Sequence, residues 1–476
     1  MPAIAFDNTY AQLPERFHVR MAAEPVSSPA LIAVNADLAR VMGIEPEWLG
    51  SPEGLAWLSG NAVPEGAEPL AMAYAGHQFG NFVPQLGDGR ALLIGEVVGR
   101  DGVRRDIQLK GSGRTPFSRM GDGRAALGPV LREYIVSEAM HALGVPTTRA
   151  LAAVTTGDPV LREAGPLPGG VLARVGQSHV RVGTFEYFYA RRDAEGLALL
   201  ADYVIERHYP ALRGDDDRYA KLIEAVAARQ AALVAQWMRL GFIHGVMNTD
   251  NCQIAGETID YGPCAFMEAF DPGKVFSSID HAGRYAWGNQ GRIAHWNVSR
   301  LAQALLPILG EGEAAVERAQ AAVDTFPDAF SKAHVEGFSR KLGLAEPDPE
   351  FVNETLEMLA EAAPDWTLFW AALTEEATGG EVDPAALLGG ADAERWLNAW
   401  RARSPDPAPM RAENPIYIPR NHRVEEAIAA GVDGDFEPFE RLLSVVTRPF
   451  DPQPESAAYR APASAEEEVR VTFCGT

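Results

Sequence analysis

Cysteine, basic residues and long apolar runs are scarce in this sequence, and each shortage excludes a class of protein. Its three cysteines, Cys252, Cys264 and Cys474, cannot build a disulfide framework and are too far apart for a zinc site. No run of about 18 apolar residues is present, so we expect no membrane-spanning helix. The N-terminus lacks a basic start followed by an apolar stretch, and we therefore expect a cytoplasmic protein.

Positive charge is the next shortage. Lysine and arginine number 42 against 65 aspartates and glutamates, a formal net charge of -23. This balance argues against a nucleic-acid partner, because phosphate backbones are bound by basic surfaces. One stretch reverses the trend, and it indicates either a solvated positive face or a positive pocket for a small polyanion such as ATP. The basic residues of that stretch are Arg104, Arg105, Lys110, Arg114, Arg119, Arg124 and Arg132.

The length and composition are those of an ordinary globular protein with a large core. The chain has 476 residues, of which 47% are hydrophobic and 22% charged. A chain of this length is expected to divide into two or three lobes.

A glycine-rich turn followed by two strands is predicted in the first third of the chain. Ala91 to Val98 and Arg104 to Lys110 have the composition of strands, and a glycine-containing turn joins them. Before them, Gly87 and Gly89 are expected to leave backbone N–H groups free to approach phosphates, and Arg90 adds positive charge.

Lys110 ends the second predicted strand, as the phosphate-pairing lysine of a kinase does. After a polar, glycine-rich loop, a helix is predicted from Pro129 through Leu143. It carries two acids, Glu133 and Glu138, that are candidates to pair with Lys110. They lie on different faces of the helix, so only one of them can pair, and we prefer Glu133.

Two arginines on the next predicted elements are further phosphate-binding candidates. Thr148 to Thr156 and Gly170 to Gly176 read as strands, and Arg174 lies on the second of them. Arg181 follows seven residues later. Arginine suits phosphate because its planar fork donates two parallel hydrogen bonds. The segment from Thr184 to Arg191 is expected to be a hinge between lobes.

The stretch from Gly241 to Gly262 carries the strongest signal. It follows a long amphipathic helix and begins with a polar loop that contains Asp250 and Asn251. Two very short strands are then expected to form a tight hairpin, and the second ends on Asp260. An acid, an amide and a second acid form an all-oxygen set suited to Mg²⁺ or Mn²⁺, and a magnesium-nucleotide site is its natural use.

The order of these parts is that of the kinase fold, with one departure. When the loop is laid on the kinase catalytic loop, Val246 falls where a kinase keeps its catalytic aspartate. Valine cannot accept a proton. Asp250 is the only carboxylate in the loop that can take over the role of general base. The alternative interpretation is a polar surface loop without chemistry.

These elements predict an α+β, bilobal protein kinase-like fold with N- and C-terminal extensions. We expect residues 1–70 to be an N-terminal extension with short helices, for example from Pro29 to Val41. Residues 71–190 are expected to form a β-rich N-lobe, and residues 191–447 a mainly helical C-lobe. Residues 448–476 are acidic and rich in proline, which predicts poor packing or an extended path over the surface.

The motifs taken together resemble the selenoprotein O family, also called the YdiU family, over nearly the whole chain. The resemblance implies a kinase-like fold that holds ATP inverted in the cleft and transfers AMP, instead of the γ-phosphoryl group, to protein hydroxyls. Some family members also transfer UMP with Mn²⁺. The motifs are Ala75-Gly-His-Gln-Phe-Gly, Gln85-Leu-Gly-Asp-Gly-Arg-Ala, Leu109-Lys-Gly-Ser-Gly-Arg-Thr-Pro-Phe-Ser-Arg, Asp122-Gly-Arg-Ala, His244-Gly-Val-Met-Asn-Thr-Asp-Asn, Ile259-Asp-Tyr-Gly-Pro and Gly283-Arg-Tyr.

The resemblance also implies a role for each matching residue. Phosphates would be held by one lysine and two arginines, a divalent cation by an amide and a carboxylate, and the acceptor proton by an aspartate. These residues are Lys110, Arg174 and Arg181 for phosphates, Gly87, Gly89, Arg90, Asp122 and Gly123 for other nucleotide contacts, Asn251 and Asp260 for the cation, and Asp250 as the base.

The end of the chain departs from the family pattern. Family members commonly end in Cys-x-Ser-Ser, where eukaryotic members place selenocysteine, whereas this chain ends Phe473-Cys-Gly-Thr. The change weakens the case for a redox role of Cys474 through pairing with Cys264 or Cys252.

Three hypotheses about function follow. The first is a monomeric protein adenylyltransferase that uses ATP, or also UTP, with Mg²⁺ or Mn²⁺ to modify Ser, Thr or Tyr hydroxyls of protein substrates. The second is a γ-phosphoryl kinase in which Asp250 replaces the missing loop aspartate. The third is an ATP-binding pseudokinase scaffold, which is disfavoured because a scaffold has no need of the lysine, the metal ligands and a base together.

Overall fold

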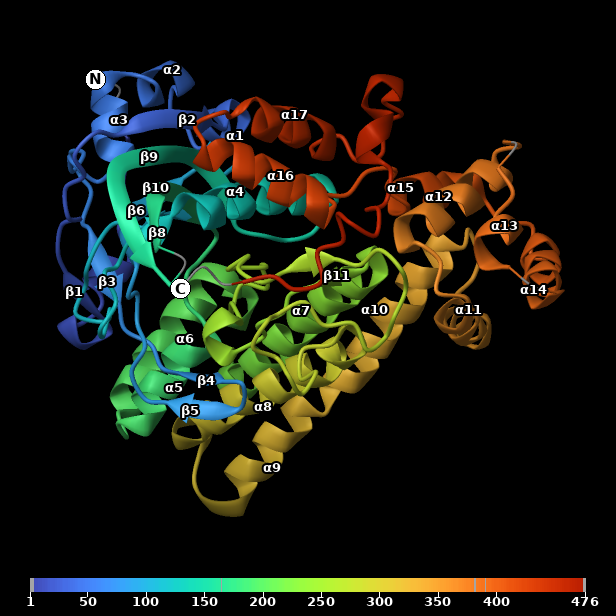
Figure 1. Ribbon diagram of the computed structural model, residues 1–476. Coiled ribbons are helices and arrows are strands. Elements are labelled where there is room, and N and C mark those ends of the chain that lie inside the picture. The colour runs from blue at the N-terminus through green and yellow to red at the C-terminus, as the bar shows by residue number, and fades with distance from the viewer. Residues whose placement is uncertain (1–3, 164, 381, 390, 474–476) are drawn as a thin grey trace.

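The computed structural model describes residues 4–163, 165–380, 382–389 and 391–473. They form a β-rich N-terminal lobe and a mainly helical C-terminal lobe (Figure 1). This arrangement is α+β and bilobal, as the kinase-like interpretation predicted. No helix in the described ranges is long and apolar enough to cross a membrane.

One antiparallel sheet, eight-stranded over the described residues, forms the centre of the N-lobe. Its order is β1-β3-β6-β7-β10-β9-β2, with β8 beside β10. The two strands predicted around Lys110 are β6 and β7, with the predicted bounds. The strands are β1 (His18–Arg20), β2 (Ala30–Val34), β3 (Leu70–Met72), β6 (Ala91–Val98), β7 (Arg104–Lys110), β8 (Ala125–Ala126), β9 (Arg149–Arg162) and β10 (Gly165–Gly176).

Both faces of this sheet are covered, which is why β6 reads as a continuous apolar run. Leu38, Leu49 and Trp57 pack on one face, from α1 (Ala36–Val41), α2 (Pro46–Leu49) and α3 (Pro52–Leu58). The other face is covered by α4 (Leu127–Ala142), over which α16 (Asn421–Val432) and α17 (Glu437–Val446) lie (Figure 1).

The first 70 residues do more than the predicted extension. They supply β1 and β2, the strands at the two ends of the sheet order. The helix predicted from Pro29 to Val41 is wrong over residues 30–34, because this segment pairs with β9 as strand β2. The position of the predicted domain boundaries stays a prediction.

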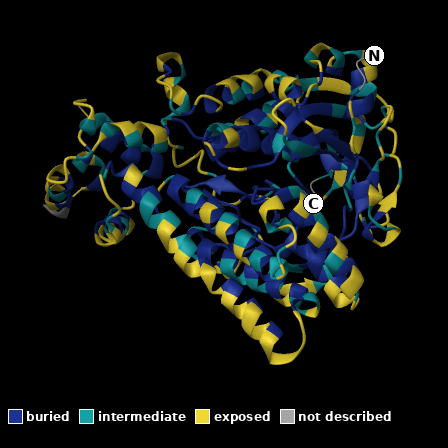
Figure 2. Cartoon of the chain, turned by 180° about the vertical axis from the view of Figure 1, so that it is seen from behind, coloured by how far each residue is buried: buried dark blue, intermediate teal, exposed yellow. Residues whose placement is uncertain are grey.

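The C-lobe is built around α7 (Arg218–Leu240), whose apolar face was predicted correctly. Leu222, Val226, Leu233, Trp237 and Leu240 are all buried, and Gly241 ends the helix with φ 71°. Helices at the rim of the lobe keep exposed outer faces, whereas the segments between them are mostly buried (Figure 2).

The other C-lobe helices follow in chain order. The hinge expected from Thr184 to Arg191 is wrong over residues 184–190, because they lie inside a regular helix, α5. These helices are α5 (Val182–Ala190), α6 (Ala194–His208), α8 (Gln290–Leu309), α9 (Gly312–Val323), α10 (Thr325–Lys341), α11 (Pro349–Ala362), α12 (Trp366–Ala377), α13 (Ala385–Leu388), α14 (Ala391–Arg401) and α15 (Pro407–Glu413).

A small two-stranded ribbon lies apart from the main sheet. It consists of β4 (Gly76–Gln78) and β5 (Asn81–Val83), which pair with each other. Although it comes from the N-terminal part of the chain, it lies against the C-lobe helices α5 and α8 (Figure 1).

The hairpin predicted between Asn251 and Asp260 is not formed. Gln253 pairs with Arg181 and Thr258 pairs with Thr147, so the two arms bond to other segments instead of to each other. The strands that pair in this region are instead β11 (Phe242–Ile243) and β12 (Ala265–Phe266), which lie before and after the segment from Asn251 to Asp260.

The tail follows an extended path over the C-lobe, as its composition predicted. The Ala463 N–H donates to Glu268 at 3.1 Å, and Thr472 pairs with Ser277. Cys252 and Cys264 are free and buried, and Cys474 lies outside the described residues.

Candidate active site

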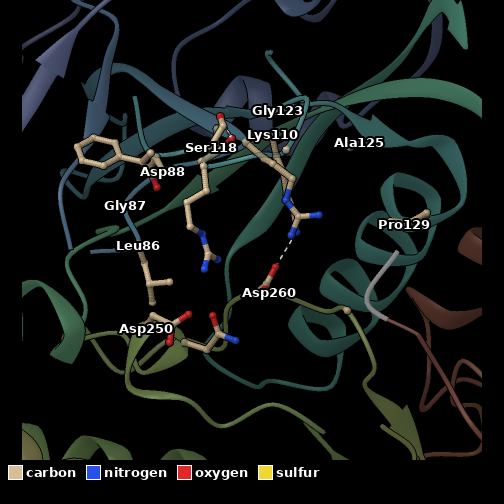
Figure 3. Close-up of a pocket in the computed structure, with 18 of the residues that line it drawn as sticks. Leu86, Gly87, Asp88, Lys110, Ser118, Gly123, Ala125, Pro129, Asp250 and Asp260 are labelled. Carbon is tan, nitrogen blue, oxygen red and sulfur yellow. Dashed lines mark hydrogen bonds and ion pairs between the residues drawn. The ribbon is translucent and has the colours of Figure 1, made fainter. Parts of the chain in front are cut away.

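A cavity of about 1200 Å³ lies between the two lobes (Figure 3). Its walls come from β6, β7, α4 and β10 on one side and from residues 246–262 on the other. The structure brings all the predicted site residues to this one cavity, while their roles stay predictions. They are Gly87, Gly89, Arg90, Lys110, Asp122, Gly123, Glu133, Arg174, Arg181, Asp250, Asn251 and Asp260.

Lys110 connects the two lobes across the cavity. Its Nζ lies 2.5 Å from Oε2 of Glu133 on α4 and 2.6 Å from Oδ1 of Asp260 (Figure 3). Glu138 is held elsewhere, because it accepts hydrogen bonds from Arg149 at 2.6 Å and 2.9 Å. The preference for Glu133 as the partner of Lys110 is therefore correct.

Asp260 is a carboxylate kept ionised by the cations around it. Burial by itself raises its pKa, but Lys110, Arg174 and Arg90 outweigh burial and hold the pKa well below the usual range. Its backbone has φ 69°, a left-handed conformation that is uncommon outside glycine. Its side chain keeps 34% exposure, so part of the carboxylate is open to the cavity.

Arg174 and Arg181 are buried cations in the cavity wall, with 4% and 5% exposure. Arg174 lies 3.0 Å from Glu133, so this one glutamate joins Arg174 to Lys110. Arg181 stacks over the ring of Tyr74 at 4.3 Å and lies 3.8 Å from Asp88. Fixed, forked donors of this kind suit a phosphate chain.

The glycines before β6 have a steric role, and the free N–H predicted at Gly89 is not found, whereas that of Gly87 stays a prediction. The Gly89 N–H donates to the Gly87 carbonyl at 2.8 Å and is therefore not free for phosphate. Gly87 has φ 73°, and any Cβ there would overlap the Phe117 ring. A Cβ on Gly89 would lie 2.9 Å from the Phe117 carbonyl. Both glycines let the loop that follows β7 fold down onto the cavity.

That loop is fixed by Asp122 and Gly123. Asp122 accepts from the Arg124 N–H and from Arg162, each at 2.9 Å. Gly123 has φ 69°, and a Cβ there would overlap the Gly113 backbone. Asp122 thus holds the loop closed over the cavity.

The predicted positive cluster is only partly correct. Arg104 pairs with Asp7, Arg105 with Asp101, and Arg132 with Glu425, and none of these three arginines lines the cavity. The cavity gathers its cations from the whole N-lobe instead. Seven basic residues face six acids there, in a chain with 42 basic and 65 acidic residues. The basic residues are Arg90, Lys110, Arg114, Arg119, Arg162, Arg174 and Arg181.

Asp250 has the environment of a general base. The residue is 8% exposed, and burial raises its pKa to about 6 against the opposing effect of Arg181. Gln78 donates to Oδ2 at 3.2 Å. Within the described residues, Oδ1 has no hydrogen-bond partner. Oδ1 is itself buried, and a Cβ on Gly76 would lie 2.6 Å from it, so the backbone of β4 packs closely against this oxygen. Both oxygens are therefore held in place in a residue that lines the cavity, and a carboxylate with a raised pKa suits the role of proton acceptor.

Asn251 and Asp260 fit a divalent cation. Asn251 donates its Nδ2–H to the Val246 carbonyl at 3.1 Å, which leaves its amide oxygen for another partner. No described residue donates to Oδ2 of Asp260. An amide oxygen and a carboxylate beside a cavity for phosphates are the ligands from which Mg²⁺ sites are built. When bound, the ion would neutralise charge on the phosphates.

Sequence reasoning assigned no role to several residues that line this cavity, among them Tyr74, Gln78, Asp88 and Asn248. Asp88 is 2% exposed and accepts from Gln108 and from the Met72 N–H. Asn248 accepts from the Phe79 N–H at 3.0 Å and from the Tyr285 hydroxyl at 2.7 Å. Gln78, Asp88 and Asn248 lie in motifs of the family resemblance, which is the signal that was available, whereas Tyr74 lies just before the first of these motifs.

Comparison with known proteins agrees with this geometry. Residues 1–447 match the family described as "Protein adenylyltransferase SelO". The chain is 57% identical to "Protein nucleotidyltransferase YdiU" of Methylorubrum extorquens, and the match covers 99% of each chain. It is 56% identical to the protein of the same name from Rhodopseudomonas palustris and 54% identical to that from Bradyrhizobium diazoefficiens, again over 99% of each chain.

The family match spans most of the chain and contains every residue of the cavity described above. The family resemblance noted in the sequence is therefore correct. The chain belongs to the protein adenylyltransferase SelO family, and it is similar to a YdiU nucleotidyltransferase over 99% of each chain.

Proposed function

We propose that this nucleotidyltransferase transfers AMP from ATP to Ser, Thr or Tyr hydroxyls of proteins and releases pyrophosphate. The observation that carries the proposal is Asp250, a buried carboxylate with a raised pKa in the wall of a cavity rich in fixed cations. The family description supports adenylyl transfer, and the broader name of the relatives supports transfer of a nucleotidyl group.

Each group of the cavity has a chemical task in this reaction. Asp250 accepts the proton of the acceptor hydroxyl, whose oxygen attacks the α-phosphorus of ATP. The bond from the α-phosphorus to the oxygen that bridges to the β-phosphorus breaks, and pyrophosphate leaves. Lys110, Arg174 and Arg181 hold the phosphates and stabilise the charge that develops on the leaving group. Asn251 and Asp260 would hold Mg²⁺ or Mn²⁺.

The nucleotide contacts of Gly87, Arg90, Asp122 and Gly123, and a contact of Gly89 other than through its N–H, form part of the same proposal. Use of UTP, the protein substrates, a monomeric state and a cytoplasmic location stay predictions.

The test uses two preparations of ATP, one labelled at the α-phosphate and one at the γ-phosphate. After incubation with Mg²⁺ or Mn²⁺, we expect protein-bound label only from the α-phosphate. Asp250→Ala should lower the rate of labelling about 100-fold or more, and EDTA should abolish labelling. Label from the γ-phosphate alone would instead establish a γ-phosphoryl kinase. The kinase is the second candidate, because the pairing of Lys110 with Glu133 is also what a kinase needs.

A further inference from the structure

The β4–β5 ribbon contacts the proposed base directly. Gln78, the last residue of β4, lines the cavity and donates its Nε2–H to Oδ2 of Asp250 at 3.2 Å. The two residues are 172 positions apart in the chain. In Figure 1 the ribbon lies beside the C-lobe helices α5 and α8, outside the main sheet of the N-lobe.

Three consecutive residues, His77, Gln78 and Phe79, form hydrogen bonds with residues 248–250 of the loop that carries Asp250. Gln78 is the middle one of the three. The His77 N–H donates to the Thr249 hydroxyl at 2.6 Å. The Phe79 N–H donates to Oδ1 of Asn248 at 3.0 Å. The contact between Gln78 and Asp250 is therefore held from both sides, and the ribbon cannot shift along the loop without breaking all three bonds.

A single buried carboxylate, that of Glu186 on α5, locks this arrangement. Its side chain is 4% exposed. One of its oxygens lies 2.5 Å from Nδ1 of His77 on the ribbon, and the other accepts from the Thr249 hydroxyl of the loop, also at 2.5 Å. Glu186 thus connects His77, which precedes Gln78 in the ribbon, to Thr249, which precedes Asp250 in the loop.

The backbone of the ribbon segment also lies very close to Asp250 and to the start of α5, so a side chain does not fit at the points of contact. A Cβ on Gly76 would lie 2.6 Å from Oδ1 of Asp250. A Cβ on Gly183, at the start of α5, would overlap the Ala75 carbonyl, and the Ala75 N–H donates to the Gly183 carbonyl at 2.9 Å. Glycine at both places lets the ribbon reach Asp250.

We propose that the β4–β5 ribbon is the positioning element of the active site and that Gln78 is a positioning residue acting through Asp250. Gln78 donates to Oδ2, and the backbone at Gly76 packs against Oδ1, so the ribbon contacts both oxygens and fixes the orientation of the carboxylate. The inference rests on the proposed function, because it requires Asp250 to be the base. It assigns a task to the Ala75-Gly-His-Gln-Phe-Gly motif, which the nucleotide contacts leave unexplained.

The test compares kcat for AMP transfer with nucleotide binding in the full-length chain. Label from α-labelled ATP is measured on the chain itself and on casein, and the Kd of a non-hydrolysable ATP analogue is measured in parallel. We expect Gln78→Leu to lower kcat about 10- to 100-fold, the range that a misplaced catalytic group costs, with the Kd unchanged. Gln78→Glu, which has the same shape but no donor, should lose as much. Asn81→Ala, exposed on the same ribbon, is the matched control and should keep wild-type kcat.

A double-mutant cycle separates positioning from a general structural role. In an Asp250→Ala background Gln78→Leu should cause no further loss, because the group through which it acts is gone. An additional loss there, or wild-type kcat in Gln78→Leu, would overturn the inference while leaving the proposed function intact. Full activity of Asp250→Ala would instead overturn the proposed function. Glu186→Gln should lower kcat with the same non-additivity.

Discussion

At the scale of single residues, Glu133 is the acid that joins two of the side chains proposed to bind phosphate. It contacts both Lys110 and Arg174, at 2.5 Å and 3.0 Å. Glu133→Gln removes the charge that holds both cations in place. Hydrogen bonds to charged groups contribute about 1.5–3 kcal/mol, so we expect kcat/KM for ATP to fall about 10- to 100-fold.

The same helix provides a matched control for this substitution. Glu138→Gln loses its ion pair with Arg149 outside the cavity, and we expect it to weaken folding without changing kcat/KM. Steady-state kinetics of the two variants decide the point. Equal kinetic effects of both substitutions would show that Glu133 acts only through stability.

The rate should depend on the ionisation of Asp250. Its pKa is raised to about 6 because the side chain is buried. A base must be deprotonated, so kcat/KM should fall as the pH drops through about 6 and level off above it. A pH profile of AMP transfer, with a buffer of constant ionic strength, measures this limb. A profile that stays flat through this range would remove Asp250 from the role of base.

At the scale of elements, the sequence patterns predicted correctly those helices and strands whose position depends on nearby residues. The bounds of β6 and β7 were correct because a glycine-containing turn separates two runs of strand composition, and the buried face of α7 was correct because helical periodicity reports which side of a helix is covered. Strand β2 was read as helix because a short apolar segment has no clear period and its partner, β9, lies more than 100 residues away.

Predictions for the candidate active site were limited in the same way, because local sequence patterns do not report contacts between distant segments. The sequence indicated that Lys110 needs an acid on α4, but the choice of Glu133 over Glu138 depends on how α4 is turned against the sheet. The hairpin expected near Ala255 failed because Gln253 and Thr258 find partners in other segments. Gln78 was missed because nothing local indicates that the ribbon reaches the C-lobe.

The turn between Gln253 and Thr258 carries a testable dependence of stability on pH. Glu257 is buried, accepts from the Gln177 N–H at 2.8 Å, and has its pKa raised to about 7 by burial. A raised acid pKa favours the protonated form in the folded state. Stability is therefore full below the unfolded-state pKa and falls as the pH rises to about 7, by about 3 kcal/mol in total.

Glu257→Gln should remove this dependence. Urea unfolding between pH 5 and pH 8 is expected to show a smaller loss of stability with rising pH in the variant than in the wild type. The exposed Glu224→Gln, on α7, is the matched control. A variant that loses stability with pH as steeply as the wild type does would contradict the assignment.

At the scale of the whole molecule, buried ion networks connect segments that are distant in the chain. Asp106 on β7 contacts His179 at 3.1 Å and Arg207 on α6 at 2.5 Å, so it joins the sheet to the C-lobe. Arg207 also lies 3.2 Å from Glu96 on β6. These contacts hold the sheet of the N-lobe and helix α6 of the C-lobe in a fixed position relative to each other.

A second network, around Arg420, joins α16 to the C-lobe and the tail. Arg420 is 1% exposed and lies 2.9 Å from Asp365, the N-cap residue of α12, and 3.1 Å from Glu268. Its Nε–H donates to the Arg460 carbonyl at 3.0 Å. Arg420→Ala would leave two partly buried carboxylates without their cation. Removal of one partner from a buried pair costs about 3–5 kcal/mol, so we expect a large drop in the free energy of unfolding.

The control for Arg420 is an exposed pair on the neighbouring helix. Arg441 pairs with Glu437 on α17, and both side chains are more than half exposed. Arg441→Ala should change stability by at most about 1 kcal/mol. Neither arginine lines the cavity, so the Kd of an ATP analogue should stay at the wild-type value in both variants. If Arg420→Ala unfolds at the same urea concentration as Arg441→Ala, the network is not what holds α16 and the tail to the C-lobe.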